Sequence, residues 1–329
     1  MKKDAIITFD YEVFLGSKTG SVENSVLKPA GEILKVLKKN AAKAIFFVDT
    51  TWLSFIKEHF PEDFEKVAKQ LKDIVASGSS VELHLHPQWL DARVEGDAIV
   101  FNSLKHYTLQ SLDRQQIFDL FKNSIELLQS ITGQKISCFR AGGWCIEPFE
   151  TIKPVFEAFN IKYEFSAVPG IFLCEGKEYD YDFRNVPDEL FYRFSDTINE
   201  NIPDGTFIEF PVSTYSNSPI YRLTNKILLS LKKDRIFGDG ISAKESKFNK
   251  TVKKAMKLTK GMITLDKMSS LMFRYLLATH FGKTKLVVAV SHPKIVSPQA
   301  LLNLEYISGK FTTYSADELE NLIIKLKNR

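Results

Sequence analysis

Short runs of β-branched and aromatic residues alternate along the chain with longer amphipathic stretches, a pattern typical of strands alternating with helices. The predicted strands are the runs AIITFDY (5–11), KAIFFVDT (43–50), SVELHLH (80–86), KISCFRA (135–141), IKYEFSA (161–167), GTFIEFPV (205–212) and KLVVAVSH (285–292). The predicted helices cover residues 28–39, 61–77, 111–131 and 147–160, with two more at the C-terminal end. This alternation implies an α/β domain over residues 1–329 whose parallel sheet is either open or closed into a barrel.

Charged and histidine side chains occupy the ends of four of these predicted strands. They are, in chain order, Asp10, Glu12, His84, His86, Arg140 and His292. In parallel α/β sheets and barrels, the active site forms at the carboxyl ends of the strands. We therefore expect these side chains to meet at one mouth of the domain.

The run VELHLHPQW (81–89) places two histidines two positions apart. Side chains alternate across a strand, so His84 and His86 face the same side, and the same rule brings Asp10 and Glu12 together. Two imidazoles and a carboxylate are a ligand set typical of catalytic zinc or another divalent metal, with positions left for water and substrate. The spacing alone leaves one alternative open, a pair of hydrogen-bonded core histidines.

Four short motifs, taken in order and approximate spacing, resemble those of the polysaccharide deacetylase family, also called carbohydrate esterase family four or the NodB homology domain. They are TFDYE (8–12), HLHP (84–87), RAGGW (140–144) and VSHP (290–293). Within the family, the chain is most similar to divergent cytoplasmic members associated with cell-surface polysaccharide loci, including lipopolysaccharide biosynthesis. The resemblance implies a distorted, incomplete (β/α) barrel and a divalent metal ion, with zinc as the expected ion, that hydrolyses N-acetyl groups from sugars.

The resemblance also implies a role for each strand-end residue. Asp10 would be the general base and Arg140 would orient it. His84 and His86 would bind the metal, and His292 would be the general acid that protonates the leaving amine. Each role agrees with the chemistry of amide hydrolysis, in which a water loses a proton and an amine gains one.

Substrate contacts are expected from three further residues. Trp144 lies where the family supplies a backbone N–H to the oxyanion and an aromatic wall to the sugar, and Trp89 and Glu209 are expected to bind the substrate with it. A buried, paired carboxylate is the alternative for Glu209. Asp180 and Asp182 are candidates for the carboxylate that tunes the acid histidine, with an acidic loop as the alternative.

Two motifs depart from the family pattern. The first usually has two adjacent aspartates, the second of which binds the metal, but here Tyr11 occupies that position and a carboxylate follows at Glu12. We therefore assign Glu12 to the metal. The family's histidines are usually four positions apart, and counting four back from His86 leads to Glu82, which we take as a reserve ligand.

Residues 217–285 differ from the rest of the chain in charge. They contain 16 Lys and Arg against 4 Asp and Glu, a balance of +12, so the rest of the chain carries −8 of the overall +4. We read this interval as a basic helical insertion that is either a solvated elaboration or attracted to an anionic partner. Replacing its lysines 232, 233, 253, 254 and 257 by glutamine is predicted to weaken binding to anionic vesicles or phosphate-bearing substrates.

The composition restricts the class of protein and its compartment. The chain has 44% hydrophobic and 26% charged residues and three cysteines, which indicates a globular protein without a disulfide framework. No secretory signal or membrane-spanning run is recognised, so we expect a cytoplasmic protein that can lie peripherally at the inner face of the membrane.

Three functions remain open at this point. The first is a metal-dependent N-deacetylase acting on an N-acetylated sugar, a nucleotide-sugar or a lipid-linked glycan, with no nucleic-acid partner. The second is a metal-free glycoside hydrolase that uses paired carboxylates among Asp10, Glu12, Glu82 and Glu209. The third is a catalytically degenerate protein that only binds carbohydrate.

Overall fold

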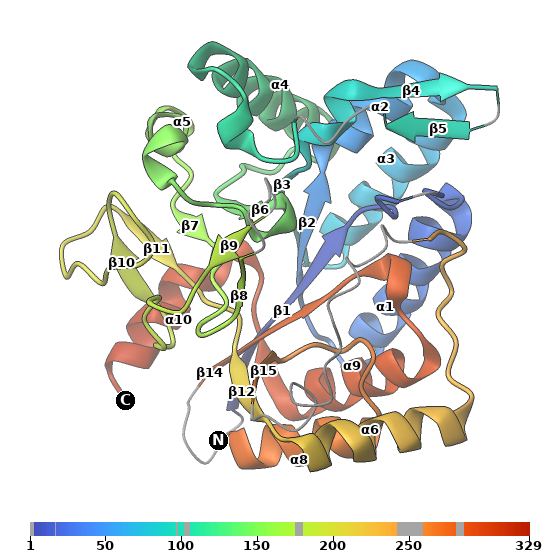
Figure 1. Ribbon diagram of the computed structural model, residues 1–329, viewed down its shortest axis with the longest axis vertical. Helices are drawn as coiled ribbons and strands as arrows, with labels where there is room; N and C mark the ends of the chain where they lie inside the picture. Colours follow the sequence, from blue (N-terminus) through green and yellow to red (C-terminus); the bar gives the residue numbers. More distant parts are fainter. Residues whose placement is uncertain are drawn as a thin grey trace.

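The computed structural model describes residues 3–16, 18–96, 98–101, 106–174, 180–241, 259–280 and 286–329. Within these residues, the centre of the molecule is a nine-stranded sheet (Figure 1). Its main path runs in the order β10 (Tyr192–Phe194), β11 (Phe207–Glu209), β7 (Tyr163–Glu164), β6 (Cys138–Ala141), β3 (Ser80–Leu85), β2 (Ile45–Asp49), β1 (Lys3–Tyr11) and β14 (Leu286–Ser291).

The strands of this sheet are parallel at every pairing except β10 with β11. The short strand β15 (Phe311–Thr313) pairs with the start of β1. Among the described residues, the path does not join its two ends, so the sheet curls around a core without closing. Parallel pairing brings the carboxyl ends of β1, β3, β6 and β14 to the same edge.

Helices connect and cover the strands. They are α1 (Lys28–Lys39), α2 (Thr50–His59), α3 (Pro61–Ala76), α4 (Arg114–Thr132), α5 (Lys153–Phe159), α6 (Pro219–Lys232), α8 (Ser270–His280), α9 (Pro298–Lys310) and α10 (Leu319–Lys327). Local sequence explains where several of them begin and end. Asp113 and Gln116 form a capping box at the start of α4, and Gly133 ends that helix in the left-handed region.

The strands of the barrel are buried on both faces. Ile7 and Phe9 of β1 pack outward into the core beneath the helices, whereas Ile6 faces the barrel interior. Aromatic residues such as Phe47 and Phe165 fill that interior together with apolar side chains of α10. Each large apolar side chain that is fully buried stabilises the fold by roughly 1.5–3 kcal/mol. The barrel interior is thus a packed apolar core below the polar residues at the carboxyl ends of the strands.

Most of the predicted strands and helices are present, and the structure adds several elements that periodicity did not show. The helix α2 follows β2 directly, because the side chain of Asp49 caps it by accepting from the backbone N–H of Trp52. Three small antiparallel sheets lie outside the barrel: β4 (Ala92–Glu95) with β5 (Ala98–Phe101), β8 (Phe172–Leu173) with β9 (Tyr181–Asp182), and β12 (Thr214–Asn217) with β13 (Thr259–Met262).

The basic interval 217–285 contains a strand as well as helices, because β13 lies between α6 and α8 and pairs with β12. Residues 242–258 and 281–285 lie outside the described residues. The division of the chain into one barrel domain with an insertion at 217–285 stays a prediction. None of the helices in the described ranges has the length and apolar character to cross a bilayer.

Candidate metal centre and catalytic cavity

A cavity of about 230 Å³ opens at the carboxyl edge of the barrel strands. Six of its lining residues were predicted from sequence: Asp10, Glu12, His84, His86, Trp144 and His292. Residues that the sequence did not single out complete the lining, among them Tyr107 and Lys294. The structure therefore brings strand ends that lie far apart in the sequence to one mouth, as the parallel topology requires.

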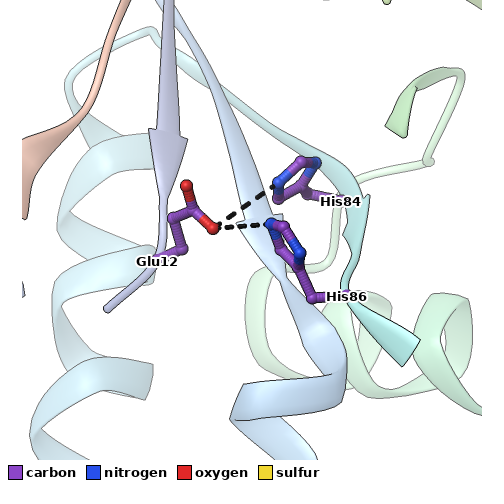
Figure 2. Close-up of side chains that lie close together, drawn as sticks. All are labelled: Glu12, His84 and His86. Carbon is purple, nitrogen blue, oxygen red and sulfur yellow. Dashed lines mark ion pairs between the residues drawn. The ribbon is translucent and has the colours of Figure 1, made fainter. Parts of the chain in front are cut away.

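The carboxylate of Glu12 lies opposite the two histidines (Figure 2). Its Oε2 atom is 2.7 Å from Nε2 of His86 and 3.8 Å from Nε2 of His84. All three side chains are buried, and their potential ligand atoms lie within 4.8 Å of one another. The three residues thus form a compact set of two nitrogens and one oxygen.

The other ring nitrogen of His84 fixes its tautomer. His84 Nδ1 is 2.7 Å from the carbonyl oxygen of Arg140, and a carbonyl only accepts, so Nδ1 carries the proton. Nε2 of His84 is then an acceptor without a hydrogen-bond partner, and it lies 3.8 Å from another acceptor, Glu12 Oε2. Buried polar atoms normally have partners, so two acceptors that face each other at this distance fit a divalent cation between them.

The electrostatic potential in the cavity also suits a cation. Burial by itself would lower the pKa of His84, but Glu12 and Asp10 beside it raise that pKa above its ordinary value. Carboxylates that favour a proton on a buried imidazole favour a divalent cation at the same point. Two nitrogens and one carboxylate oxygen form a donor set that zinc and related ions accept.

A glycine allows His86 to come this close to the next strand. A Cβ added to Gly142 would lie 2.3 Å from the carbonyl oxygen of Leu85 and 2.7 Å from Nδ1 of His86. No side chain fits in that space. The first glycine of the RAGGW motif is therefore required by the position of the His86 ring.

Asp10 forms a buried ion pair with Arg140. The Nη1 atom of Arg140 donates to Asp10 Oδ1, while its Nε donates to the carbonyl of Phe165 at 3.0 Å and Nη2 to Thr8 Oγ1 at 2.9 Å. Burial opposes ionisation of Asp10, but Arg140 and His292 outweigh it and hold the pKa of that carboxyl well below its usual range. Asp10 is therefore a carboxylate whose orientation is set by a guanidinium that is itself hydrogen-bonded to Phe165 and Thr8.

His292 faces this carboxylate from the last barrel strand. Its Nε2 is 3.4 Å from Asp10 Oδ2, and its Nδ1 is 3.5 Å from Oδ2 of Asp266. Burial would lower the pKa of His292, but Asp10, Asp266 and Glu12 raise it to about 9. The imidazole is thus protonated near neutral pH and able to donate a proton into the cavity.

Asp266 is the carboxylate beside His292, and it was not among the residues predicted from sequence. It is buried and accepts hydrogen bonds from Ser291 Oγ at 2.7 Å and from the backbone N–H of His292 at 3.1 Å. The predicted candidates lie elsewhere: Asp182 forms an exposed ion pair with Arg184 at 2.5 Å, which is the acidic-loop alternative. One feature of the sequence could have pointed to Asp266: it is one of only four acidic residues in the basic interval 217–285.

Lys294 is the second residue that sequence analysis missed. Its Nζ donates to Glu12 Oε1 at 2.9 Å and to the carbonyl of Val13 at 3.1 Å. Burial would raise the pKa of Glu12, but Lys294 and the histidines keep it well below the ordinary value. One oxygen of Glu12 is thereby held by the lysine, and the other is turned toward the histidines.

Trp144 lines the cavity from a strained turn. The φ angles of Gly143 and Trp144 are +62° and +68°, and a non-glycine residue in this left-handed region costs on the order of 1 kcal/mol or more. Its ring lies 5.7 Å from the guanidinium carbon of Arg140. The turn exposes an aromatic ring next to the proposed general base.

Three predicted site residues lie away from this cavity. Glu82 is two residues, or about 6.6 Å, before His84 along the strand, and its Oε2 accepts from the backbone N–H groups of Ser137 and Cys138. Burial raises its pKa to about 8. The expectation of a reserve ligand is not supported, since backbone N–H groups bind Oε2 and Glu82 does not line the cavity.

Glu209 and Trp89 make contacts within the protein core and lie outside the cavity. Glu209 lies beside Glu164 on the neighbouring strand and accepts from the N–H of Ala167 at 3.0 Å, so the alternative of a buried, paired carboxylate is what the structure shows. The ring of Trp89 packs between Phe55 and Phe101 at centroid distances of 5.2 and 4.9 Å. Neither contacts the cavity described above, so their predicted substrate-binding roles are not supported.

Comparison with known proteins agrees with the fold. Residues 1–146 match the family model described as polysaccharide deacetylase. A Mycobacterium smegmatis protein assigned as a polysaccharide deacetylase has a similar crystal structure, with a TM-score of 0.54 at 14% identity over 99% of this chain and 92% of the other. The predicted incomplete (β/α) barrel is confirmed, and the match to the polysaccharide deacetylase model covers the part of the chain that contains TFDYE, HLHP and RAGGW.

Two further solved structures cover most of the chain with lower scores. The CE4 domain of a multidomain xylanase from the hindgut metagenome of Trinervitermes trinervoides has a TM-score of 0.42 at 10% identity, over 98% of this chain and 92% of that one. A CE4 family pseudoenzyme from Bacillus anthracis has 0.43 at 12% identity, over 97% and 65%. No curated protein matches the chain significantly.

Proposed function

We propose that this protein is a metal-dependent carbohydrate N-deacetylase. One observation carries the proposal: Glu12 Oε2 and the Nε2 atoms of His84 and His86 converge in a buried cavity, with the tautomer of His84 held by Arg140. A paired carboxylate and a protonated histidine lie beside this set. The polysaccharide deacetylase family model over residues 1–146 supports hydrolysis of an acetyl group as the reaction.

Glu12, His84 and His86 would hold the ion, and zinc suits their donor atoms. When bound, a divalent cation polarises a carbonyl oxygen and lowers the pKa of water, which supplies the nucleophile for hydrolysis at neutral pH. Lys294 contributes by holding Glu12 in a single orientation. The ligand set is complete in this chain, which argues against the catalytically degenerate alternative.

Asp10 and His292, which line the cavity beside the proposed metal ligands, would transfer the protons. Asp10, oriented by Arg140, would accept the proton of the attacking water. His292, charged because of Asp10 and Asp266, would then give its proton to the nitrogen of the leaving amine. Trp144 would face the sugar and offer its backbone N–H to the oxyanion that forms when water adds to the acetyl carbon.

The glycoside hydrolase alternative is less consistent with the cavity. Such an enzyme needs one carboxylic acid that is protonated near neutral pH beside one that is ionised. Both carboxyls in the cavity, Asp10 and Glu12, have pKa values shifted below their ordinary range. The protonated acids Glu82 and Glu209 are buried elsewhere, so the required pair does not meet.

The identity of the substrate is proposed at the level of class. The substrate would be an N-acetylated sugar in the synthesis of a cell-surface polysaccharide, and a nucleotide or a lipid carrier stays a prediction. A cytoplasmic location likewise stays a prediction.

The test combines elemental analysis of the purified protein with measurement of acetate released from N-acetylated sugars and sugar nucleotides. His86→Ala should lower metal affinity steeply and abolish acetate release, because the remaining donors cannot complete the site. His59→Ala, at the exposed end of α2, is the matched control and should retain both. Absence of metal, with no rescue by added zinc, cobalt or manganese, would remove the proposal.

A further inference from the structure

The helices α6 and α8 form a surface that the proposed chemistry does not use. Figure 1 shows both along the lower edge of the molecule, near the start of β1, while β1 runs away from this edge toward its carboxyl end. A groove of about 770 Å³ lies between them, lined by residues such as Tyr221, Thr224 and Tyr275. No residue lines both this groove and the catalytic cavity.

One side of α6 is attached to the protein. Tyr221 is buried, and its hydroxyl lies 3.4 Å from the carbonyl of Met272 at the start of α8. The side chain of Asn225 accepts from the N–H of Ser269 at 2.9 Å and donates to the carbonyl of Lys267 at 2.9 Å. These contacts fix which face of α6 points outward.

The outward face of α6 is apolar. Ile220, Leu223, Ile227 and Leu231 follow the spacing i, i+3, i+7 and i+11, so they form one stripe along a helix about 21 Å long. Each of them is at least half exposed, and Ile220 is 78% exposed. Isolated surface leucines are common, but a contiguous stripe of this length marks an interaction surface.

The neighbouring helix α8 extends the same surface. Leu271 and Tyr275 are 64% and 58% exposed. Tyr275 also lines the groove, together with Ile220 of the α6 stripe. We define the α6–α8 face as the exposed apolar residues Ile220, Leu223, Ile227, Leu231, Leu271 and Tyr275.

Most charges on and next to the two helices are positive. Neither α6 nor α8 contains an acidic residue, while basic residues on and next to the helices surround the apolar stripe. They are Arg222, Lys226, Lys232, Lys233, Arg235 and Arg274. Asp234 binds Ser297 and Asp266 binds Ser291, while Asp188, which lines the groove, is exposed and paired with Lys260 at 3.1 Å. The surface is therefore apolar in the middle and positive at its margins.

We propose that the α6–α8 face docks on the surface of an anionic lipid bilayer. A helix with leucine and isoleucine on one side and lysine on its flanks places its apolar side among the acyl chains and its ammonium groups among anionic headgroups. A second copy of this chain fits less well, since a two-fold contact between identical faces would bring like charges together. This proposal does not depend on the deacetylase activity.

The test measures co-sedimentation with vesicles of phosphatidylglycerol and phosphatidylcholine at low and high salt, compared with vesicles of phosphatidylcholine alone. The full-length protein should bind the anionic vesicles at low salt and release them as salt screens the charges. Equal binding to neutral vesicles, or no binding to anionic vesicles at low salt, would overturn the proposal.

Two variants separate the apolar and the charged contributions. The stripe variant carries Leu223→Gln, Ile227→Gln and Leu231→Gln, and the charge variant carries Lys226→Gln, Lys232→Gln and Arg235→Gln. Each basic residue near an anionic surface strengthens binding about fivefold, so the charge variant should lose about 100-fold at low salt. The stripe variant should lose binding even where salt is low.

The matched control removes three lysines from other exposed surfaces: Lys72→Gln, Lys122→Gln and Lys327→Gln, on α3, α4 and α10. It changes the net charge as much as the charge variant does and should retain most of the binding. Equal losses in the control and charge variants would mean that only net charge matters, and this would overturn the docking face. Circular dichroism establishes that every variant is folded.

Self-association is a separate outcome. A dimer in sedimentation velocity that the stripe variant abolishes, without any vesicle binding, would assign the face to a second copy and overturn the proposal. Lys253, Lys254 and Lys257, which the sequence also suggested as contributors, lie outside the described residues and are not part of this test.

Discussion

Two groups of acidic residues lie buried in the same barrel and differ in charge. Asp10 and Glu12, at the carboxyl ends of the strands, have pKa values below their ordinary range. Glu82, Glu164 and Glu209 lie deeper, and their pKa values are raised. Burial is nearly complete in both groups, so burial does not explain the difference.

The difference comes from the neighbouring cations. Arg140 and His292 face Asp10, and Lys294 faces Glu12. The deeper acids accept hydrogen bonds from backbone N–H groups, and Glu164 and Glu209 also repel each other's charge. A buried carboxylate without a paired cation takes up a proton, so only the acids at the strand ends are available as ligand and base.

The largest expected effect comes from neutralising an acid at the strand ends. Asp10→Asn keeps the shape of the side chain but cannot accept a proton, so turnover should fall by about 10²–10⁴-fold. Metal content measured by elemental analysis should be unchanged. Glu82→Gln is the matched control in the deeper group and should keep its turnover. Loss of metal in Asp10→Asn would show that Asp10, and not Glu12, is the ligand.

Removing the positive charge of Arg140 should raise the pKa of Asp10, as burial does for Glu82, Glu164 and Glu209. Arg140→Met leaves a buried carboxylate without its partner, which should lower the free energy of unfolding at neutral pH by about 3–5 kcal/mol. Urea denaturation measures this change. The loss should shrink as the pH falls and Asp10 becomes protonated; a loss that does not depend on pH would contradict the electrostatic explanation.

Filling the space that Gly142 leaves for His86 should have an intermediate effect on metal affinity. Gly142→Ala should displace the imidazole and lower metal affinity by about 10–100-fold, as expected for a change that disturbs ligand orientation. Titration with a metal indicator measures the affinity. Gly31→Ala, within α1, tests for a general effect of losing a glycine at a position where an added Cβ meets nothing. Equal affinity in Gly142→Ala and the wild type would contradict the steric argument.

The two groups should also give opposite slopes of stability against pH. The folded pKa of Glu82 is raised from 4.5 to about 8, so the folded state binds the proton more tightly and its stability falls as pH rises between these values. Asp10, whose pKa is lowered, contributes stability above its unfolded pKa that is lost as the pH falls.

Glu82→Gln should remove the part of the slope that comes from Glu82. The variant should match the wild type near pH 4.5 and exceed its free energy of unfolding at pH 8 by at least about 1.4 kcal/mol, the equivalent of one pKa unit. Urea denaturation across this pH range is the measurement. Parallel curves for the two proteins would contradict the raised pKa of Glu82.

The smallest effect is expected from Glu209→Gln. The amide oxygen still accepts from the N–H of Ala167, and its NH₂ group replaces the proton that lies between Glu209 and Glu164. Stability at neutral pH should change by less than about 1 kcal/mol, as for a hydrogen bond replaced by another of similar geometry. A large loss of turnover in this variant, with the fold intact, would return Glu209 to the list of substrate-binding residues.

Much of the fold and site could be predicted from sequence. The period-2 pattern identified the strands that carry Asp10, His84 and Arg140, and their order along the chain implied a common edge. Periodicity failed at α2, because the run of strand residues ends at Asp49 and the helix begins at once. Asp49 reads as the end of a strand, although its side chain caps the helix.

Strand alternation was not enough to identify which acids are functional. Glu82 shares the strand face of His84 and His86, yet it lies one step deeper, where backbone N–H groups bind it. The partners of Glu12 and His292 could not be predicted either. Lys294 and Asp266 reach them from segments whose sequence has no pattern of its own.

The sequence by itself determined the local features of this protein: the alternation of strands and helices, the pairing of side chains two apart, and the residue types at the strand ends. These follow from interactions between neighbours along the chain, so they can be read from spacing. Only the tertiary structure decided the charge of each buried carboxyl, because that charge depends on a cation or an N–H group from another strand. The same holds for the outward direction of the α6 stripe, which is set by the contacts of Tyr221 and Asn225 with residues more than 40 positions away.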